Sequence, residues 1–246
     1  MHKLISQLRR LYLPDGAYAP ELLEQRLLGN CTDLIGLSSE AGLARAVVIE
    51  FNKLPDAEET QHWDLLCAVA NALQTELGLP APAVSISGSD GYGLWLSLDK
   101  PARPQQIRTL VNLLQTAYFP NIAHSAAAPL ALVELPPCLH ADSGKWAAFI
   151  HPGLGASFAG EPGLDMAPPL AGQCALLEGL HSISEAQLAH AIAVLQQSHG
   201  EVRAVIEQSQ TRSTAPDGLL LADATIEDIV RHLHAKNIEP SFRYLI

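Results

Sequence analysis

Polar residues able to bind a cation occur where an apolar segment of the sequence ends. Glu50 and Asn52 follow the run Val47-Val48-Ile49, which has the composition of a strand. Strand alternation places Glu50 and Asn52 on one face, as two ligands of one metal ion would require. Mg²⁺ and Mn²⁺ take oxygen ligands. The pair therefore indicates either a divalent-cation site at Glu50 or two polar residues that end a strand.

A turn-rich segment offers groups that could face a nucleotide. It reads Ser87-Gly88-Ser89-Asp90-Gly91 and separates two β-rich runs, of which the second continues through Gly93. Two glycines and an aspartate favour a hairpin turn. The sequence leaves open whether the segment is only a turn or also a loop that faces a nucleotide.

Three further candidates lie between positions 134 and 145. Glu134 is a carboxylate at the end of an expected strand, and His140 could form a site together with His151 or be a solvated histidine. Lys145 follows a Ser-Gly pair and suits either a phosphate contact or a solvated turn. The upstream glycine of a P-loop is absent, which excludes a Walker site.

A hydrolase site is a weaker alternative. It would combine Ser157 with His151 or His181 and with Asp165. The serine lacks the following glycine of a nucleophile elbow.

The elements that must position these groups alternate between strands and helices. We expect strands over residues 44–51, 83–87, 92–98, 130–134, 146–150 and 202–206. We expect short helices within residues 1–30 and longer ones over 61–77, from Pro104 to before Pro120, from Ser184 with a capping box to Gln187, and over 226–236. Residues 151–172 are rich in Gly and Pro and predict an irregular loop, and residues 208–218 predict a mobile polar segment.

This order of elements predicts an α+β fold, with an antiparallel or mixed sheet flanked by helices. We expect a core over residues 1–172 and a helical or mixed subregion, rich in α-helix, over 173–246. The strands that carry Glu50, residues 87–98 and Glu134 should belong to one sheet.

Composition restricts the classes of partner. The 246 residues carry a formal charge of −11, and the 15 lysines and arginines form no block longer than Arg9-Arg10, which disfavours sequence-independent nucleic-acid binding. No apolar run is long enough to span a membrane, and the N-terminus does not resemble a signal peptide. Four scattered cysteines without a C-x-x-C pair predict reduced thiols in the cytoplasm.

Over residues 40–150 the sequence resembles the catalytic core of the archaeo-eukaryotic primase (PrimPol-like) superfamily. The family's first motif, an apolar strand ending in two carboxylates, is similar to the segment that ends in Glu50 and Asn52. Its second motif, S-G-x-x-G-Y-H-L-W, is similar to S-G-S-D-G-Y-G-L-W over residues 87–95. The L-P-G-S-L-H-x-K-T-G stretch of mobile-element and plasmid members is similar to L-P-P-C-L-H-A-D-S-G-K over residues 135–145, and the family's Y-P connection is similar to Y-F-P-N over residues 118–121.

The resemblance implies roles for individual residues. Glu50, Asn52 and Glu134 would stand at the positions of the metal-binding carboxylates, where a cofactor would be Mg²⁺ or Mn²⁺. The nucleotide would meet the following positions: Ser87, Gly88, Gly91, Gly93, His140 and Lys145. Asn52 is neutral, and Gly93 replaces the histidine that contacts phosphate in the family. Because two-metal nucleotidyl transfer needs several anionic ligands, these departures predict a catalytically inactive member.

The expected function is therefore that of a primase-like protein that binds a nucleotide or nucleic acid, or that serves as an accessory replication factor of a mobile element. One alternative is a divergent nucleotidyl transferase or nuclease that uses Glu50, Glu134 and either Asp90 or His140. The other is a protein–protein adaptor without a nucleotide site. An electropositive cleft beside Glu50 and Ser87 would favour a nucleotide or nucleic acid, and an acidic or filled cleft would favour the adaptor.

Overall fold

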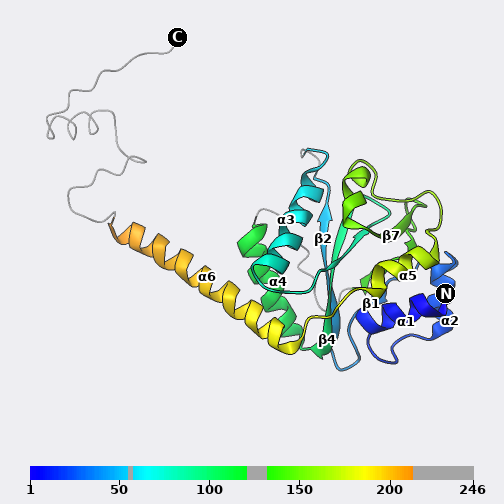
Figure 1. Cartoon of the computed structure of the whole chain (residues 1–246), viewed down its shortest axis with the longest axis horizontal. Helices are drawn as coiled ribbons and strands as arrows, with labels where there is room; N and C mark the ends of the chain where they lie inside the picture. The colour runs from blue at the N-terminus through cyan, green and yellow to red at the C-terminus, as the bar shows by residue number, and fades with distance from the viewer. Residues whose placement is uncertain (55–57, 121–131, 213–246) are drawn as a thin grey trace, which may run out of the picture. The chain divides into compact units, whose positions relative to one another are not determined.

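The computed structural model describes residues 1–54, 58–120 and 132–212, with side chains up to residue 198. These residues form an α+β fold in which helices cover both faces of an antiparallel sheet (Figure 1). Contacts divide the chain into two units, Met1–Gln196 and Gln197–Ile246. The sheet, its two cores and the pocket described below all belong to the first unit.

The main sheet has five strands in the order β2-β4-β3-β7-β6, and every neighbouring pair is antiparallel. Its strands are β2 (Ala44–Asn52), β3 (Ala83–Ile86), β4 (Gly91–Ala102), β6 (Cys138–Leu139) and β7 (Trp146–Ile150). The expected hairpin over residues 83–98 is confirmed as β3 and β4. Strand β4 is buried on both sides along most of its length, as the apolar composition of its first half predicts.

A separate two-stranded sheet corrects one expectation. Strand β5 (Leu132–Val133) pairs with β1 (Ile35–Gly36), in register Ile35 with Val133, and not with the main sheet. The prediction that the strand before Glu134 shares a sheet with β2 and the hairpin is therefore wrong. Of the expected 130–134 strand, the structure describes residues 132–134; Leu132 and Val133 pair with β1, and Glu134 follows outside this ladder.

Three helices cover the first face of the main sheet: α3 (Gln61–Thr75), α4 (Pro104–Tyr118) and the first turns of α6 (Glu185–Arg212). In Figure 1 they lie together on one side of the strands. Their buried residues recur every three or four positions, as in Leu66, Val69 and Leu73 of α3. This face of the sheet is correspondingly apolar, with Ile49, Phe51 and alternate residues of the neighbouring strands in one core.

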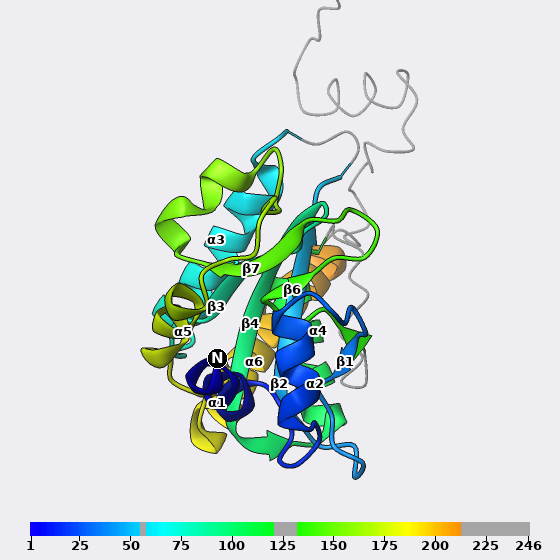
Figure 2. The same cartoon turned by 90° about the vertical axis from the view of Figure 1, so that its right-hand side faces the viewer.

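The second face is covered by α1 (His2–Leu11), α2 (Pro20–Leu27) and α5 (Leu170–Glu178). Figure 2 shows α1 and α2 in front of the sheet. An aromatic cluster anchors this core: the ring of Tyr12 lies 5.3 Å from that of Trp95 and 5.7 Å from that of Phe149, centre to centre. These helices cover only part of the face, and the remainder is open beside β2.

The C-terminal half contains more helix than we expected. The capping box at Ser184 is confirmed, because Gln187 N–H donates to Ser184 Oγ and Ser184 N–H donates to Gln187 Oε1. Helix α6 then continues to Arg212, so the strand expected over residues 202–206 is wrong. The loop expected over 151–172 contains the 3₁₀-helix η1 (Pro152–Phe158) and the start of α5.

Part of the expected organisation lies beyond the described residues. The helix expected over 226–236 and most of the polar segment expected over 208–218 fall in residues 213–246. Helix α5 packs against α1 and β7, within the same compact unit as the sheet. The proposed division into residues 1–172 and 173–246 stays a prediction.

Candidate functional site

A pocket of about 270 Å³ occupies the uncovered part of the second sheet face. One row of its residues crosses three strands, because Glu50 of β2 pairs in register with Gly93 of β4, which pairs with Ser85 of β3. The opposite wall comes from β1, β5 and the residues around them. The candidate residues that line the pocket are Glu50, Asn52, Ser87, Gly93, Glu134 and His140. Segments far apart in the sequence thus converge on one cavity.

Gly93 stands where the resemblance places a phosphate-binding histidine, and its surroundings are filled. Trp95 Nε1–H donates to Ser85 Oγ over 2.8 Å directly beside it. A Cβ atom at position 93 would lie 2.8 Å from Ser85 Oγ, 2.9 Å from Trp95 Nε1 and 3.2 Å from Val48 Cγ2. A glycine is therefore required here by packing.

Gly91 allows a second close approach. It pairs in register with Asn52, and a Cβ atom at position 91 would overlap the Asn52 side chain and the carbonyl of Phe51. The Asn52 amide thus lies against the backbone of β4 at the edge of the pocket.

The Ser87–Gly91 segment is a closed turn. Ser87 N–H donates to Gly91 O and Gly88 N–H donates to Pro162 O. The N–H groups of Ser89 and Gly91 both donate to Ser87 Oγ, at 3.1 and 3.0 Å. Binding a phosphate through backbone amides needs N–H groups that are free to donate, and these four are already used.

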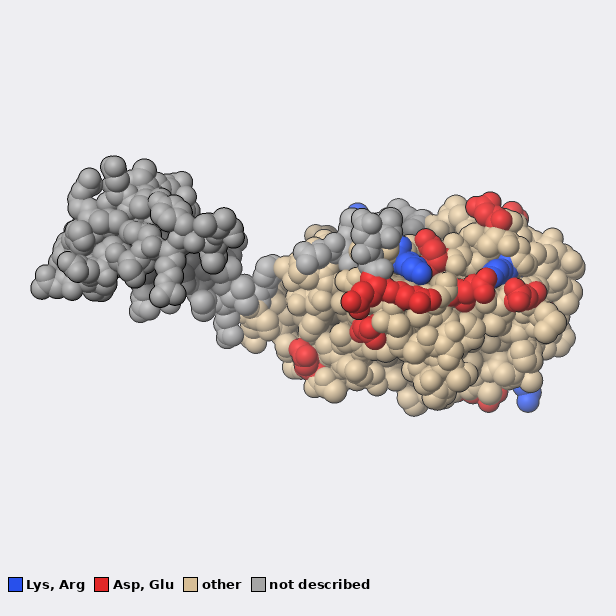
Figure 3. Space-filling model, turned by 90° about the horizontal axis from the view of Figure 1, so that it is seen from above, with Lys and Arg blue, Asp and Glu red and all other residues tan. Residues whose placement is uncertain are grey.

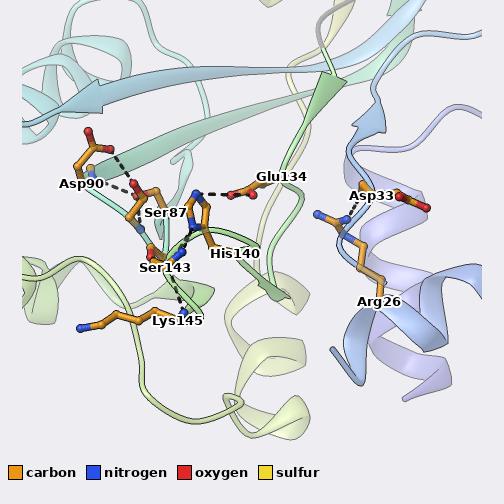
Figure 4. A network of polar contacts seen from close by, with 11 residues as sticks. Arg26, Asp33, Ser87, Asp90, Glu134, His140, Ser143 and Lys145 are labelled. Carbon is orange, nitrogen blue, oxygen red and sulfur yellow. Dashed lines mark hydrogen bonds and ion pairs between the residues drawn. The ribbon is translucent and has the colours of Figure 1, made fainter. Parts of the chain in front are cut away.

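His140 is oriented by the loop that follows β6 (Figure 4). Its Nδ1 accepts a hydrogen bond from Ser143 N–H, while the Ser143 hydroxyl donates to Gly88 O over 2.6 Å. In the neutral imidazole the proton is therefore on Nε2. That nitrogen lies 3.9 Å from Glu134 Oε1, which is too long for a hydrogen bond.

Lys145 does not line the pocket. Its ammonium group forms an ion pair with Glu161 and lies 3.8 Å from Asp165. The lysine that the resemblance assigns to a nucleotide is therefore neutralised by carboxylates. Asp165 takes part in this pairing, and His151 accepts from Gly153 N–H to cap η1, so neither is arranged as expected for the hydrolase alternative.

Carboxylates dominate the electrostatics of the pocket. Partial burial and the nearby Asp90 raise the pKa of Glu50. Burial raises the pKa of Glu134, with further increases from Asp142 and Glu50, and His140 and Arg26 oppose the shift. Among the residues that the structure describes, no lysine or arginine lines the pocket. Figure 3 likewise shows a band of acidic side chains on one face of the molecule, with few basic ones beside it.

The donor set does not fit the two divalent cations that the resemblance implies. No group of three or more His, Cys, Asp or Glu residues is arranged to hold a metal ion within the described ranges. Asn52 is neutral, and Glu134 reaches the pocket from a different sheet than Glu50. These residues therefore do not support catalysis by two metal ions.

A buried histidine lies near this site on the other face of the sheet. His62 of α3 is only 4% exposed, and neither ring nitrogen has a hydrogen-bond partner among the described residues. Its ring centre lies 5.0 Å from that of Tyr92. Burial and Lys53 lower its pKa, and Asp90 and Asp64 oppose the shift.

Sequence reasoning missed several residues of the pocket. Ser85 could have been found, because alternation in the 83–87 strand places it on the same face as Glu50 once the hairpin register is known. Leu132 of β5 and Leu34, the residue before β1, also line the pocket, and no local pattern predicts the pairing of β1 with β5.

No helix in the described part of the chain combines the length and apolar composition that membrane crossing requires. Searches with protein-family models and among curated proteins found no match to this sequence.

Proposed function

We propose that this chain is a primase-like protein that does not transfer nucleotides and instead acts as an accessory subunit that binds a partner protein. The observation that carries the proposal is the pocket itself. The family-like segments meet there, yet its charged lining consists of carboxylates without lysine or arginine. The resemblance implies a replication or maintenance complex of a mobile element as the context.

The convergence of segments supports the primase-like part of the proposal. Glu50, Gly93 and the turn at Ser87 occupy neighbouring strands or their connection, and His140 lies opposite them. Glu134 arrives from the separate β1–β5 sheet. Its equivalence to the family's third carboxylate therefore rests on its position in the pocket alone.

The chemistry of the lining argues against nucleotidyl transfer. The reaction requires anionic ligands that hold two cations and clamp the attacking and leaving oxygens. Here Asn52 adds no charge and Gly93 adds no side chain. The turn amides of Ser87, Gly88, Ser89 and Gly91 already donate hydrogen bonds within the protein, and Lys145 is paired with carboxylates.

The same charges favour a protein partner over a nucleic acid. A pocket lined by Glu50, Asp90 and Glu134 repels phosphates and attracts cationic groups. The net charge of −11 adds to the repulsion of a polyanion. The acidic lining therefore favours the protein–protein adaptor that the sequence left open.

The test is incorporation of labelled nucleotides on primed and unprimed templates with Mg²⁺ or Mn²⁺, together with anisotropy measurements on labelled single-stranded DNA. We expect neither incorporation nor saturable DNA binding. A Glu50→Ala variant is assayed in parallel. Robust incorporation that disappears in this variant would overturn the proposal and establish the divergent nucleotidyl transferase in its place.

A further inference from the structure

Three carboxylates from separate segments face the pocket, and its described lining contains no lysine or arginine. Glu50 comes from β2, Asp90 from the turn between β3 and β4, and Glu134 from the residue after β5. Figure 4 shows Asp90 and Glu134 on opposite sides of His140. Folding thus gathers negative charge around a cavity, while Arg26, the cation that opposes the raised pKa of Glu134, lies outside the lining.

The acceptor capacity of Glu134 remains available. An ionised carboxylate accepts through two oxygens and can receive a pair of donors from one group. Among the residues that the structure describes, the nearest partner of Glu134 is His140 Nε2 at 3.9 Å, beyond hydrogen-bond distance. Because Ser143 N–H bonds the other ring nitrogen, the histidine is held in place beside Glu134 without occupying its oxygens.

Apolar side chains also line the pocket, beside the polar residues Asn52, Ser85, Ser87, Ser89 and His140. Leu34 and Leu132 are large hydrophobic residues that are 48% and 62% exposed at the pocket. Val133 and Pro136 continue this wall, and the Trp95 ring contributes from the sheet. Such a wall suits an aliphatic chain that ends in a charged group.

The volume limits what can enter. Pockets for drug-sized ligands measure about 300–1,000 Å³, and this one is about 270 Å³. A pocket of this size has room for a single long side chain. A cationic head, an aliphatic stem and a small cross-section together describe the side chain of a basic residue.

We propose that the pocket receives an arginine side chain from a partner protein, with its guanidinium between Glu134 and Glu50 and its stem against Leu34 and Leu132. This inference rests on the proposed accessory function and names its ligand. Arginine suits the site better than lysine, because its planar group carries five donors that can bridge carboxylates from two walls. It is also more weakly hydrated, and arginines inserted into pockets are frequent anchors of protein interfaces.

The experiment measures calorimetric binding of the full chain to the capped peptide acetyl-Leu-Arg-Leu-amide. Parallel titrations use the same peptide with lysine in place of arginine, or with citrulline, which keeps the shape of the arginine side chain and lacks its charge. We expect saturable binding of the arginine peptide, weaker binding of the lysine peptide and none of the citrulline peptide. Binding should weaken as salt is raised, because the attraction is electrostatic.

Variants locate the binding site. Glu134→Gln and Glu50→Gln should each weaken binding of the arginine peptide about tenfold, the scale expected for losing a hydrogen bond to a charged group. Glu21→Gln makes the same charge change at an exposed position of α2, outside the pocket, and should leave the affinity for the peptide unchanged. Circular dichroism and thermal unfolding of each variant confirm that loss of binding is not loss of fold.

Three results would overturn the inference: no binding of the arginine peptide, equal binding of the citrulline or lysine peptide, or an equal effect of Glu21→Gln. Each of these leaves the proposed function standing if nucleotide incorporation is absent. Glu50-dependent incorporation would instead refute the proposed function, whatever the peptides do.

Discussion

Replacing Gly93 with alanine tests whether the site of the family's histidine is closed in this protein. The added Cβ would lie under 3.0 Å from both Ser85 Oγ and Trp95 Nε1. Overpacking of this kind costs about 1–3 kcal/mol. If Ser85 rotates away, the buried indole N–H loses its acceptor, at a further cost of about 1–3 kcal/mol.

Removing a glycine from a strand returns about 0.5–1 kcal/mol, because the unfolded chain becomes less flexible. The net loss for Gly93→Ala is therefore about 1–5 kcal/mol in the free energy of unfolding. A histidine carries the same Cβ, so restoring the family residue at position 93 should cost at least as much and should not restore nucleotide addition.

Urea unfolding followed by tryptophan fluorescence measures this loss. Gly179→Ala is the matched control, since no atom lies within 4 Å of a Cβ built there and its φ of −81° suits alanine. This control should be neutral or stabilising by up to about 1 kcal/mol. A Gly93→Ala protein as stable as the control would refute the close packing around Gly93 and reopen the position to a functional side chain.

Three further substitutions test the charges and bonds of the site. Glu50→Gln should stabilise the protein at pH 7 by up to about 1 kcal/mol, since the exposure of the group limits the effect. The pKa of Glu50 is raised in the folded state, so ionisation of this carboxyl opposes folding and the group favours the folded state only below its unfolded pKa. The stabilisation by Glu50→Gln, measured by thermal unfolding, should therefore vanish near pH 4. His62→Phe should reduce the loss of stability as pH falls from 7.5 to 5.5, because a lowered histidine pKa favours the folded state only above its unfolded value of about 6.5; thermal unfolding across this pH range measures the change. Ser143→Ala removes the bond to Gly88 O and should cost about 1 kcal/mol in urea unfolding, whereas Ser157→Ala, an exposed position in η1, should cost nothing measurable.

Local sequence patterns predicted the helices and strands that bury one regular stripe. Leu66, Val69 and Leu73 define α3 by spacing alone, and the turn residues between β3 and β4 define the hairpin. The capping pair at Ser184 and Gln187 located the start of α6 for the same reason: the signal lies within a few residues.

The parts that sequence reasoning got wrong depend on distant contacts. Residues 202–206 have strand-like composition, yet they continue a helix that was nucleated upstream. The partner of β5 is β1, which no periodicity identifies. At the site, the candidate residues followed from the resemblance, but the bond that occupies the Gly88 amide and the ion pairs of Lys145 come from Pro162, Glu161 and Asp165, which lie outside the motifs.

The β1–β5 ribbon has a consequence for the order of folding. Its pairing of Ile35 with Val133 joins positions about one hundred residues apart, a closure that costs entropy before any contact rewards it. The described part of the ribbon pairs two residues on each strand, and it cannot offset that cost until β2, β3 and β4 have already brought its ends together. Leu132 and Glu134 should therefore take their places late, so the wall of the pocket is assembled upon a sheet that already exists.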